Sequence, residues 1–237
     1  MNMKRLVIFL LVALIPLMAV PQDPISRPGK KPVQAPASKP KPKPKPKPKP
    51  QPKPSKPTTG SHNGYEWVDL GLSVKWATCN VGANSPSDYG DYYAWGETST
   101  KSSYDTDNSK TYGKSMGNIG GNSSYDVARA KWGGSWRLPT KAELEELETK
   151  CTWTWTTQGG HNGYKVTGKN GKSIFLPAAG WRRGTSRSDV GEYGYYWGST
   201  PGESSAYGAY YLGFYSSFHG VGWRYRINGF SVRPVVE

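Results

Sequence analysis

The sequence predicts an α+β fold for one domain that occupies residues 61–237. Two segments in the middle of the domain carry helix signals, and several short stretches after them alternate polar and apolar residues with the period of a strand. A long stretch rich in Gly, Ser, Tyr and Asp precedes them. Helices beside antiparallel strands are typical of the α+β class. We therefore expect short antiparallel sheets with two helices and a long irregular loop region.

The N-terminus has the features of a cleavable export signal. Lys4 and Arg5 precede an apolar run from Leu6 to Met18, which is too short for an ordinary membrane span. An uncleaved signal anchor is the alternative. No cysteine directly follows the run, which excludes a lipoprotein anchor. We expect residues 1–20 to be a signal peptide and the mature chain to be periplasmic, on the cell surface or secreted, without a transmembrane segment.

Residues 21–60 predict an extended, disordered spacer. Lys and Pro alternate without interruption from Lys39 to Pro50. Proline fixes φ and supplies no hydrogen-bond donor, so neither a helix nor a sheet can form there. At about 3.1 Å per residue the spacer could reach roughly 120 Å. Its positive charge could also contact anionic polymers of the cell envelope.

The net charge of +14 belongs mainly to this spacer, so it does not indicate nucleic-acid binding. Most of the excess Lys and Arg lies in residues 21–60, opposite the single acid Asp23. The domain itself is close to neutral. A domain that reads duplex nucleic acid carries its own basic face, and we expect no nucleic-acid partner.

The domain begins with strand-like sequence at 64–83, rich in β-branched and aromatic residues, and the irregular stretch covers 84–124. Asp126 then precedes a short helix at 127–132. Thr140 and Glu143 form the capping box of a second helix, because each side chain can bond a free backbone N–H of the first turn. The expected buried stripe of this second helix consists of Leu144, Leu147 and Cys151.

Alternation with a period of two begins at residues 152–157, where Thr and Trp alternate. Asn162-Gly163 and Asn170-Gly171 are dipeptides typical of hairpin turns. The further strands are expected at 172–178, 193–201, 209–215, 221–227 and 230–236. Motif position and alternation predict that Trp76, Trp132, Trp136, Phe175, Leu212 and Phe214 are core residues.

Seven sequence motifs follow one another along residues 63–237: WVDLGLSVKWATCNVGA, GDYYAWGET, WGGSWRLPTKAELEEL, CTWTWTT, IFLPAAGWR, YGYYWGSTP and SVRPV. In this order they resemble the Fibrobacter succinogenes major paralogous domain family, found in secreted and surface proteins of gut-type bacteria. RLPTKAEL and the terminal strand also resemble the formylglycine-generating superfamily. The resemblance implies a C-type-lectin-like fold whose first and last strands pair. It implies no established activity.

Cys79 and Cys151 are the only cysteines. In an exported domain an even number of cysteines predicts a disulfide, and two buried free thiols are the alternative. The resemblance to the formylglycine-generating enzymes does not extend to their chemistry, because those enzymes carry reactive cysteines late in the chain and none follows Cys151 here.

Groups that enzymes need for catalysis are otherwise scarce, so we expect no enzyme. The three histidines lack the spacing of metal ligands. No strand-turn-helix GxSxG element occurs. Paired carboxylates for glycoside hydrolysis could be assembled, as in almost any domain. The candidate acids for such pairs are Asp69, Asp91, Glu97 and Glu192.

No cofactor is expected, and a structural calcium ion is the alternative. Asp105, Asp107 and Ser109 could supply oxygen ligands, but the segment lacks the glycine and the terminal glutamate of a strong calcium loop. The Glu-Pro-Asn and Trp-Asn-Asp motifs of calcium-dependent animal lectins are also absent. A solvated turn is the simpler interpretation.

The segment from about 195 to 226 is rich in Tyr, Ser, Gly, Trp and Arg, a composition typical of binding surfaces. We therefore expect a non-catalytic module that binds a glycan or protein ligand. The alternatives are tyrosines that merely cover a loop-rich domain, and a structural envelope protein whose spacer is the main functional element. The candidate ligand-binding residues are Trp197, Ser199, Tyr207, Tyr211, Tyr215, His219, Trp223, Arg224 and Arg226.

Overall fold

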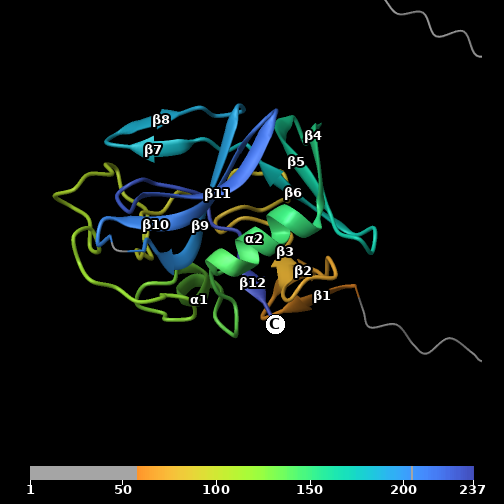
Figure 1. Ribbon diagram of the computed structural model, residues 1–237, viewed down its shortest axis with the longest axis horizontal. Helices are drawn as coiled ribbons and strands as arrows, with labels where there is room; N and C mark the ends of the chain where they lie inside the picture. Colours follow the sequence, from red (N-terminus) through yellow and green to blue (C-terminus); the bar gives the residue numbers. More distant parts are fainter. Residues whose placement is uncertain (1–57, 204) are drawn as a thin grey trace, which may run out of the picture. The chain divides into compact units, whose positions relative to one another are not determined.

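The computed structural model describes residues 58–203 and 205–237. The predicted signal peptide, and nearly all of the predicted spacer, lie outside these residues. Figure 1 shows the described part as several small sheets with two short helices between them. No helix in this part is both long and apolar enough to cross a membrane.

The predicted α+β class is wrong, because the described residues form a predominantly β structure. Twelve strands make four separate antiparallel sheets, and the two helices have only six and ten residues. After α2, closely spaced turns divide the chain into short antiparallel strands, so most of the regular structure is β and not helical. For the same reason, the C-type-lectin-like α+β arrangement that the resemblance implied is also wrong.

The first sheet contains both ends of the domain. Its strand order is β1-β2-β3-β12, so the last strand lies beside β3 and not beside the first strand. β1 begins at Thr59, slightly before the predicted start of the domain. The strands are β1 (Thr59–His62), β2 (Tyr65–Val68), β3 (Lys75–Ala77) and β12 (Val235–Val236).

Both predicted helices are confirmed: α1 spans Val127–Trp132 and α2 spans Lys141–Lys150. The Asp126 side chain accepts hydrogen bonds from two backbone N–H groups of α1. At α2 the Thr140 and Glu143 side chains form the complete capping box. Each helix therefore begins directly after a capping residue whose side chain accepts a hydrogen bond from a free backbone N–H of the first turn.

In the second sheet, β4-β5-β6, one of the two predicted hairpin turns is confirmed and the other prediction is wrong. Asn170-Gly171 lies in the turn between β5 and β6, as predicted. Asn162-Gly163 does not form a turn, because it lies within β5. The chain reverses instead at Gly159 and Gly160, whose φ angles of 57° and 83° favour glycine. The strands are β4 (Thr152–Gln158), β5 (His161–Thr167) and β6 (Ser173–Pro177).

The remaining strands form a short hairpin and a three-stranded sheet in the order β11-β10-β9, drawn in blue in Figure 1. The hairpin consists of β7 (Trp181–Arg183) and β8 (Ser186–Ser188). The three-stranded sheet consists of β9 (Tyr193–Pro201), β10 (Gly208–Tyr215) and β11 (Phe218–Tyr225).

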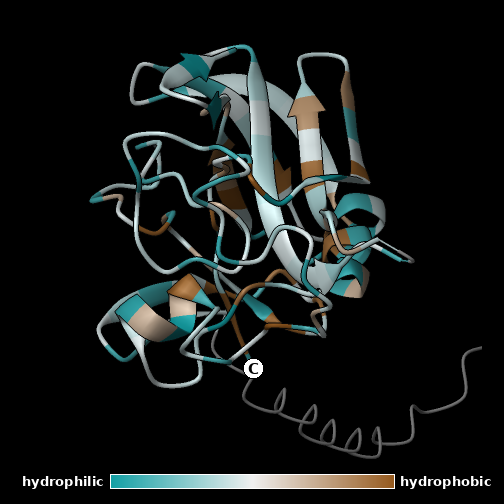
Figure 2. Cartoon of the chain, turned by 90° about the vertical axis from the view of Figure 1, so that its left-hand side faces the viewer, coloured by the Kyte–Doolittle hydropathy of each residue, from teal (hydrophilic) through white to brown (hydrophobic). Residues whose placement is uncertain are grey.

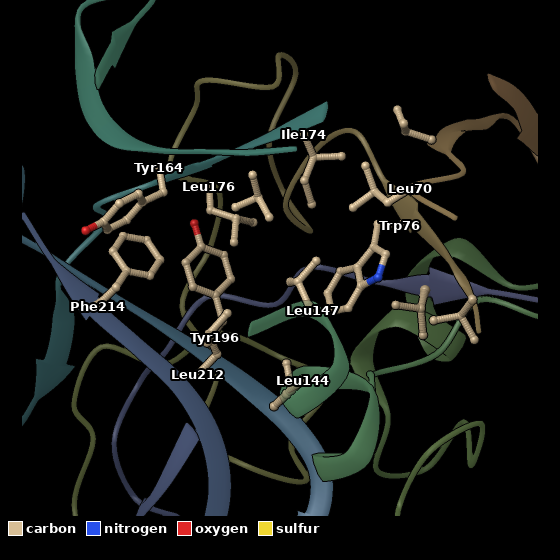
Figure 3. Close-up of a cluster of buried hydrophobic side chains, with 14 of the residues drawn as sticks. Leu70, Trp76, Leu144, Leu147, Tyr164, Ile174, Leu176, Tyr196, Leu212 and Phe214 are labelled. Atoms are coloured by element: carbon tan, nitrogen blue, oxygen red, sulfur yellow. The ribbon is translucent and has the colours of Figure 1, made fainter. Parts of the chain in front are cut away.

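A hydrophobic cluster around α2 joins three of the sheets: β1-β2-β3-β12, β4-β5-β6 and β9-β10-β11. Figure 3 shows Leu144 and Leu147 of α2 pointing toward Trp76 of β3 on one side and Leu212 of β10 on the other. All six side chains predicted to be core are buried, which confirms this set: Trp76, Trp132, Trp136, Phe175, Leu212 and Phe214.

The segment 84–124 contains no named strand or helix, as predicted. Its irregular chain is held by isolated bridges, such as that from Tyr93 to Phe230 and that from Tyr104 to Gly184. In Figure 2 the irregular chain is mostly hydrophilic, and the hydrophobic residues lie largely on strands and helices.

Candidate ligand-binding site

The β9–β10–β11 sheet presents one face to the core and the other to a pocket. Leu212 and Phe214 of β10 point into the hydrophobic cluster, as their alternation predicted. Tyr211, Gly213 and Tyr215 lie on the opposite face. The sheet therefore supports a surface whose underside is fixed by the packed core (Figure 3).

The opposite face carries a pocket of about 260 Å³, here called the aromatic pocket. Besides the inward-facing Phe214, Arg224 of β11 lines it together with five aromatic residues from all three strands. These aromatic residues are Tyr193, Tyr195, Tyr211, Tyr215 and Phe218. Every strand of the sheet thus contributes a ring to the same hollow.

Glycines form the floor of the aromatic pocket. Gly213 and Gly220 face each other across β10 and β11. A Cβ atom at Gly213 would lie 2.6 Å from Cε2 of Tyr211, and one at Gly220 would lie 2.9 Å from Cζ of Phe218. The two rings therefore lean over the glycines and lie close to the backbone of the sheet. A larger residue at either position would displace a ring.

Three pairs of rings in the pocket lie nearly parallel, whereas Tyr193 and Tyr215 are tilted by 44°. The ring centroids of Tyr195 and Tyr211 are 5.7 Å apart with an interplanar angle of 24°. Those of Tyr215 and Phe218 are 5.6 Å apart at 26°, and Tyr193 stacks on Tyr195 at 16°. Stacked aromatic pairs hold one another in place, so the lining of the pocket is preorganised.

Polar groups border these ring faces. Burial and the negative charge of Asp189 raise the pKa of Tyr195 to about 12, so its hydroxyl is protonated at neutral pH and can donate a hydrogen bond. Arg224 is exposed and adds a positive charge. The pocket therefore combines apolar ring faces with phenolic O–H groups and one guanidinium group.

Three of the predicted ligand-binding residues line the aromatic pocket: Tyr211, Tyr215 and Arg224. Three pocket residues were missed, namely Tyr193, Tyr195 and Phe218. The alternation of β9 could have indicated the two tyrosines, since Tyr193 and Tyr195 have the same parity as Trp197, which the sequence predicted to be a ligand-binding residue. What the sequence does not show is the register that places Tyr195 opposite Gly213.

Three other candidates lie elsewhere on the surface. Trp223 is 55% exposed, but it lies on the face of β11 opposite the pocket, where its ring covers Gly208. His219 stacks on Trp153 with ring centroids 4.5 Å apart. Tyr207 packs against Tyr112 at 4.9 Å. The expectation of one common surface is therefore wrong.

The last three candidates are buried, which corrects their assignment to an exposed surface. Trp197 is 1% exposed, stacks on Phe230 at 4.2 Å and donates its indole N–H to the Tyr93 carbonyl. Ser199 and Arg226 are also buried. Trp197 of β9 faces inward because it packs in a second hydrophobic cluster, which includes Trp136 and Phe230. Arg226, just after β11, faces inward because it bonds the irregular segment at Thr111.

The predicted disulfide is absent, since Cys79 and Cys151 are both free and half-buried. Their surroundings differ. Cys151 follows α2 near Glu146, and Cys79 follows β3 near the buried Arg233. The alternative of two free thiols describes the structure.

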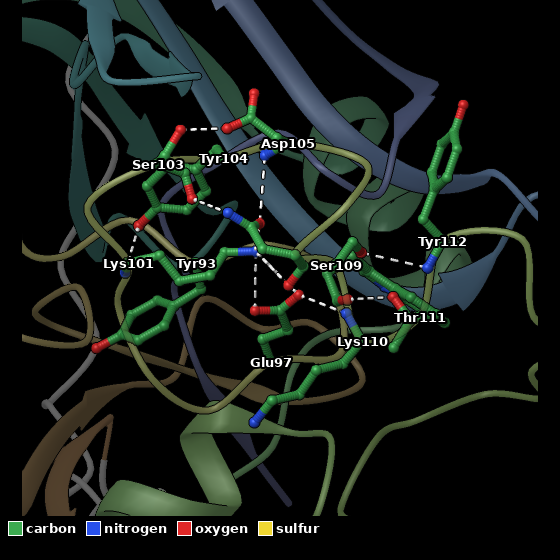
Figure 4. A network of polar contacts seen from close by, with 12 residues as sticks. Tyr93, Glu97, Lys101, Ser103, Tyr104, Asp105, Ser109, Lys110, Thr111 and Tyr112 are labelled. Carbon is green, nitrogen blue, oxygen red and sulfur yellow. Dashed lines mark hydrogen bonds and ion pairs between the residues drawn. The ribbon is translucent and has the colours of Figure 1, made fainter.

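The segment considered for calcium is organised around an ion pair (Figure 4). Lys101 Nζ lies 3.1 Å from Oε2 of the buried Glu97. Asp105 accepts a hydrogen bond from a serine two residues before it, and Asp107 accepts one from the adjacent threonine. Ser109 accepts a backbone N–H. In residues 58–203 and 205–237 no group of three or more His, Cys, Asp or Glu side chains could hold a metal ion.

Residues 155–235 match a family model described as a domain of unknown function, DUF8237. The match runs from β4 to β12 and includes all three strands of the aromatic pocket. No curated protein and no solved structure matches the chain. The resemblance to the Fibrobacter succinogenes major paralogous domain family stays a prediction.

Proposed function

We propose that this chain is an exported, non-catalytic module that binds a glycan in the aromatic pocket. The observation that supports this proposal is the set of five aromatic rings that line the pocket over a glycine floor. Flat rings offer contact area at a small cost in conformational entropy, since each has only two side-chain torsions.

The chemistry of the aromatic pocket suits a sugar ring better than a peptide. The C–H groups on one face of a sugar carry a weak positive charge, which complements the negative face of an aromatic ring. The hydroxyl groups at the edge of the sugar can bond to phenolic O–H groups, such as that of Tyr195. A pocket of about 260 Å³ lies just below the usual range for small-molecule sites, which favours one or two sugar units.

Two exposed rings on opposite faces of the same hairpin allow a matched test of this function. Phe218 is 52% exposed and lies in the pocket, whereas Trp223 is 55% exposed and lies outside it. We expect Phe218→Ala to weaken binding on a glycan array about tenfold, because one stacking partner is lost. Tyr215→Ala should have a similar effect, and Trp223→Ala should leave the affinity unchanged.

The folded state of each variant is checked by thermal unfolding before binding is compared. Equal loss of binding in Trp223→Ala and Phe218→Ala would contradict the assignment of the pocket. If no glycan binds the unsubstituted domain, the proposed function itself is wrong.

A further inference from the structure

Two arginines are buried in this domain without a carboxylate partner. Arg226 and Arg233 are each 1% exposed. Among residues 58–203 and 205–237, no Asp or Glu forms an ion pair with either. Both guanidinium groups donate to carbonyl or amide oxygens instead. Burying a positive charge without a carboxylate partner is costly, so the other groups around the two side chains must offset this cost; for Arg226 they include the ring of Trp95, whose centroid is 4.4 Å from the guanidinium carbon.

Each nitrogen of the Arg233 guanidinium group donates at least one hydrogen bond of 3.1 Å or less, and the group is enclosed. Nε donates to Oδ1 of Asn80 at 2.8 Å, and Nη2 donates to the Phe175 carbonyl at 2.9 Å. Nη1 donates to the carbonyls of Ala77 and Thr78. The cavity beside Arg233 is too small to hold a water molecule. Its role is structural.

Arg226 differs, because one nitrogen of its guanidinium group lacks a good acceptor. Nε donates to the Gly208 carbonyl at 2.9 Å, and Nη1 donates to the carbonyls of Thr111 and Lys114 at 3.1 and 2.8 Å. Nη2 has only the Ser205 carbonyl at 3.5 Å, which is the limit of a hydrogen bond. Two strong N–H donors on Nη2 are therefore poorly used.

Arg226 and Ser205, whose carbonyl is the weak acceptor of Nη2, both border a pocket of about 310 Å³, here called the arginine pocket. Arg226 lines it together with Ser115 and Ser205. The Ser205 hydroxyl accepts the backbone N–H of Tyr207 at 3.2 Å, so its own hydrogen can be donated to a ligand. The pocket is thus lined by a guanidinium group and two hydroxyl groups. The other lining residues are Met116, Pro201, Gly202 and Ala206.

The nearest acid in sequence does not neutralise this charge. Glu203 accepts hydrogen bonds from Lys141 Nζ at 3.2 Å and from the Tyr210 hydroxyl at 2.9 Å. It is engaged with these two groups and makes no ion pair with Arg226. Lys114, whose carbonyl contacts Arg226, adds a second positive charge to the surrounding loop.

We propose that the arginine pocket binds an oxyanion, a carboxylate or phosphate group carried by a larger ligand. The two N–H groups of Nη2, which lack a good acceptor, can donate charge-assisted hydrogen bonds to the oxygens of such a group. Serine hydroxyls complete its coordination. The site is separate from the aromatic pocket, because Arg226 follows the end of β11 that is paired with Gly208, and the aromatic pocket extends to the other end, at Phe218.

The test uses thermal unfolding of the domain with three small probes: glucuronate, glucose 6-phosphate and glucose. We expect each anionic probe at about ten times its Kd to raise Tm by roughly 4 °C. Any shift in Tm caused by glucose should be the same in the unsubstituted protein and in the Ser205→Asp variant described next. A response to glucuronate alone assigns a carboxylate ligand, and a response to glucose 6-phosphate alone assigns a phosphate.

Ser205→Asp is the informative variant, since Arg226→Met could fail to fold. The new carboxylate should pair with Nη2, raise Tm without any probe and abolish the response to the anions. Phe218→Ala should retain that response, which separates this site from the aromatic pocket. The proposal is overturned if neither anion raises Tm, if Ser205→Asp keeps the full response, or if Phe218→Ala removes it.

Discussion

Cys151 shows how the surroundings of a single side chain set its chemistry. Its thiol lies half-buried at the end of α2, packed against the hydrophobic cluster that includes Trp153. Burial, reinforced by the negative charge of Glu146, raises the pKa of the thiol to about 11. Since the thiolate is the reactive form, Cys151 is an inert thiol at neutral pH.

We expect native Cys151 to react with iodoacetamide about a hundred times more slowly at pH 8 than an unhindered thiol, since its pKa is about two units higher. The rate should rise steadily up to about pH 11. Mass spectrometry after timed quenching measures it. Unfolded protein should expose two reactive thiols, and a Cys79–Cys151 linked peptide under non-reducing conditions would contradict the free thiols.

At the scale of the element, the start of α2 depends on one carboxylate that serves two partners. Glu143 accepts the backbone N–H of Thr140 at 2.7 Å and both terminal nitrogens of Arg137 at 2.7 and 2.8 Å. Burial alone would raise the pKa of Glu143. The bonds from Arg137 and Thr140 outweigh it and hold this pKa below its ordinary value of 4.5.

A lowered pKa in the folded state means that Glu143 stabilises the fold above about pH 4.5, and that this contribution is lost as the pH falls through the folded-state pKa. Glu143→Gln should therefore lower the free energy of unfolding at pH 7 by about 1–3 kcal/mol. The difference from the unsubstituted domain should shrink toward about pH 3. Urea denaturation across this range measures both.

Glu145→Gln is the control for this helix. Glu145 lies on α2 as well, but its side chain is about half exposed and its ion pair with Lys141 is 3.7 Å long. Its substitution should change the free energy of unfolding by less than about 0.5 kcal/mol. A pH profile for Glu143→Gln that parallels that of the unsubstituted domain would contradict the role of the carboxylate.

At the scale of the whole domain, Arg233 connects chain segments that are far apart in sequence. Its guanidinium group bonds the end of β3 at Ala77, the following loop at Asn80, and β6 at Phe175. Arg233 itself belongs to the C-terminal segment. One side chain therefore ties the first sheet to the second.

Arg233→Met should lower the free energy of unfolding by roughly 3 kcal/mol or more, because buried carbonyl oxygens at several sites lose their donor. Urea denaturation measures the change. The matched control is Arg183→Met, since Arg183 lies exposed on β7 and should contribute little. A loss below 1 kcal/mol for Arg233→Met would show that the sheets hold together without it.

Local chemistry determined much of this fold from the sequence alone. The helix that starts at Thr140, the inward side chains Leu212 and Phe214, and the turn at Asn170-Gly171 all depend on residues a few positions apart. Capping, alternation and turn preference act over that range, so their patterns are visible in one sequence.

Tertiary structure decided what depends on distant partners. Arg224 and Arg226 are two positions apart, yet one is exposed beside a pocket and the other is buried among carbonyls of the 111–114 segment. Strand register likewise placed Tyr195 opposite Gly213 and Trp223 on the other face. Composition indicates that a region can bind, but only long-range packing determines which side of each strand is covered and which remains open to a ligand.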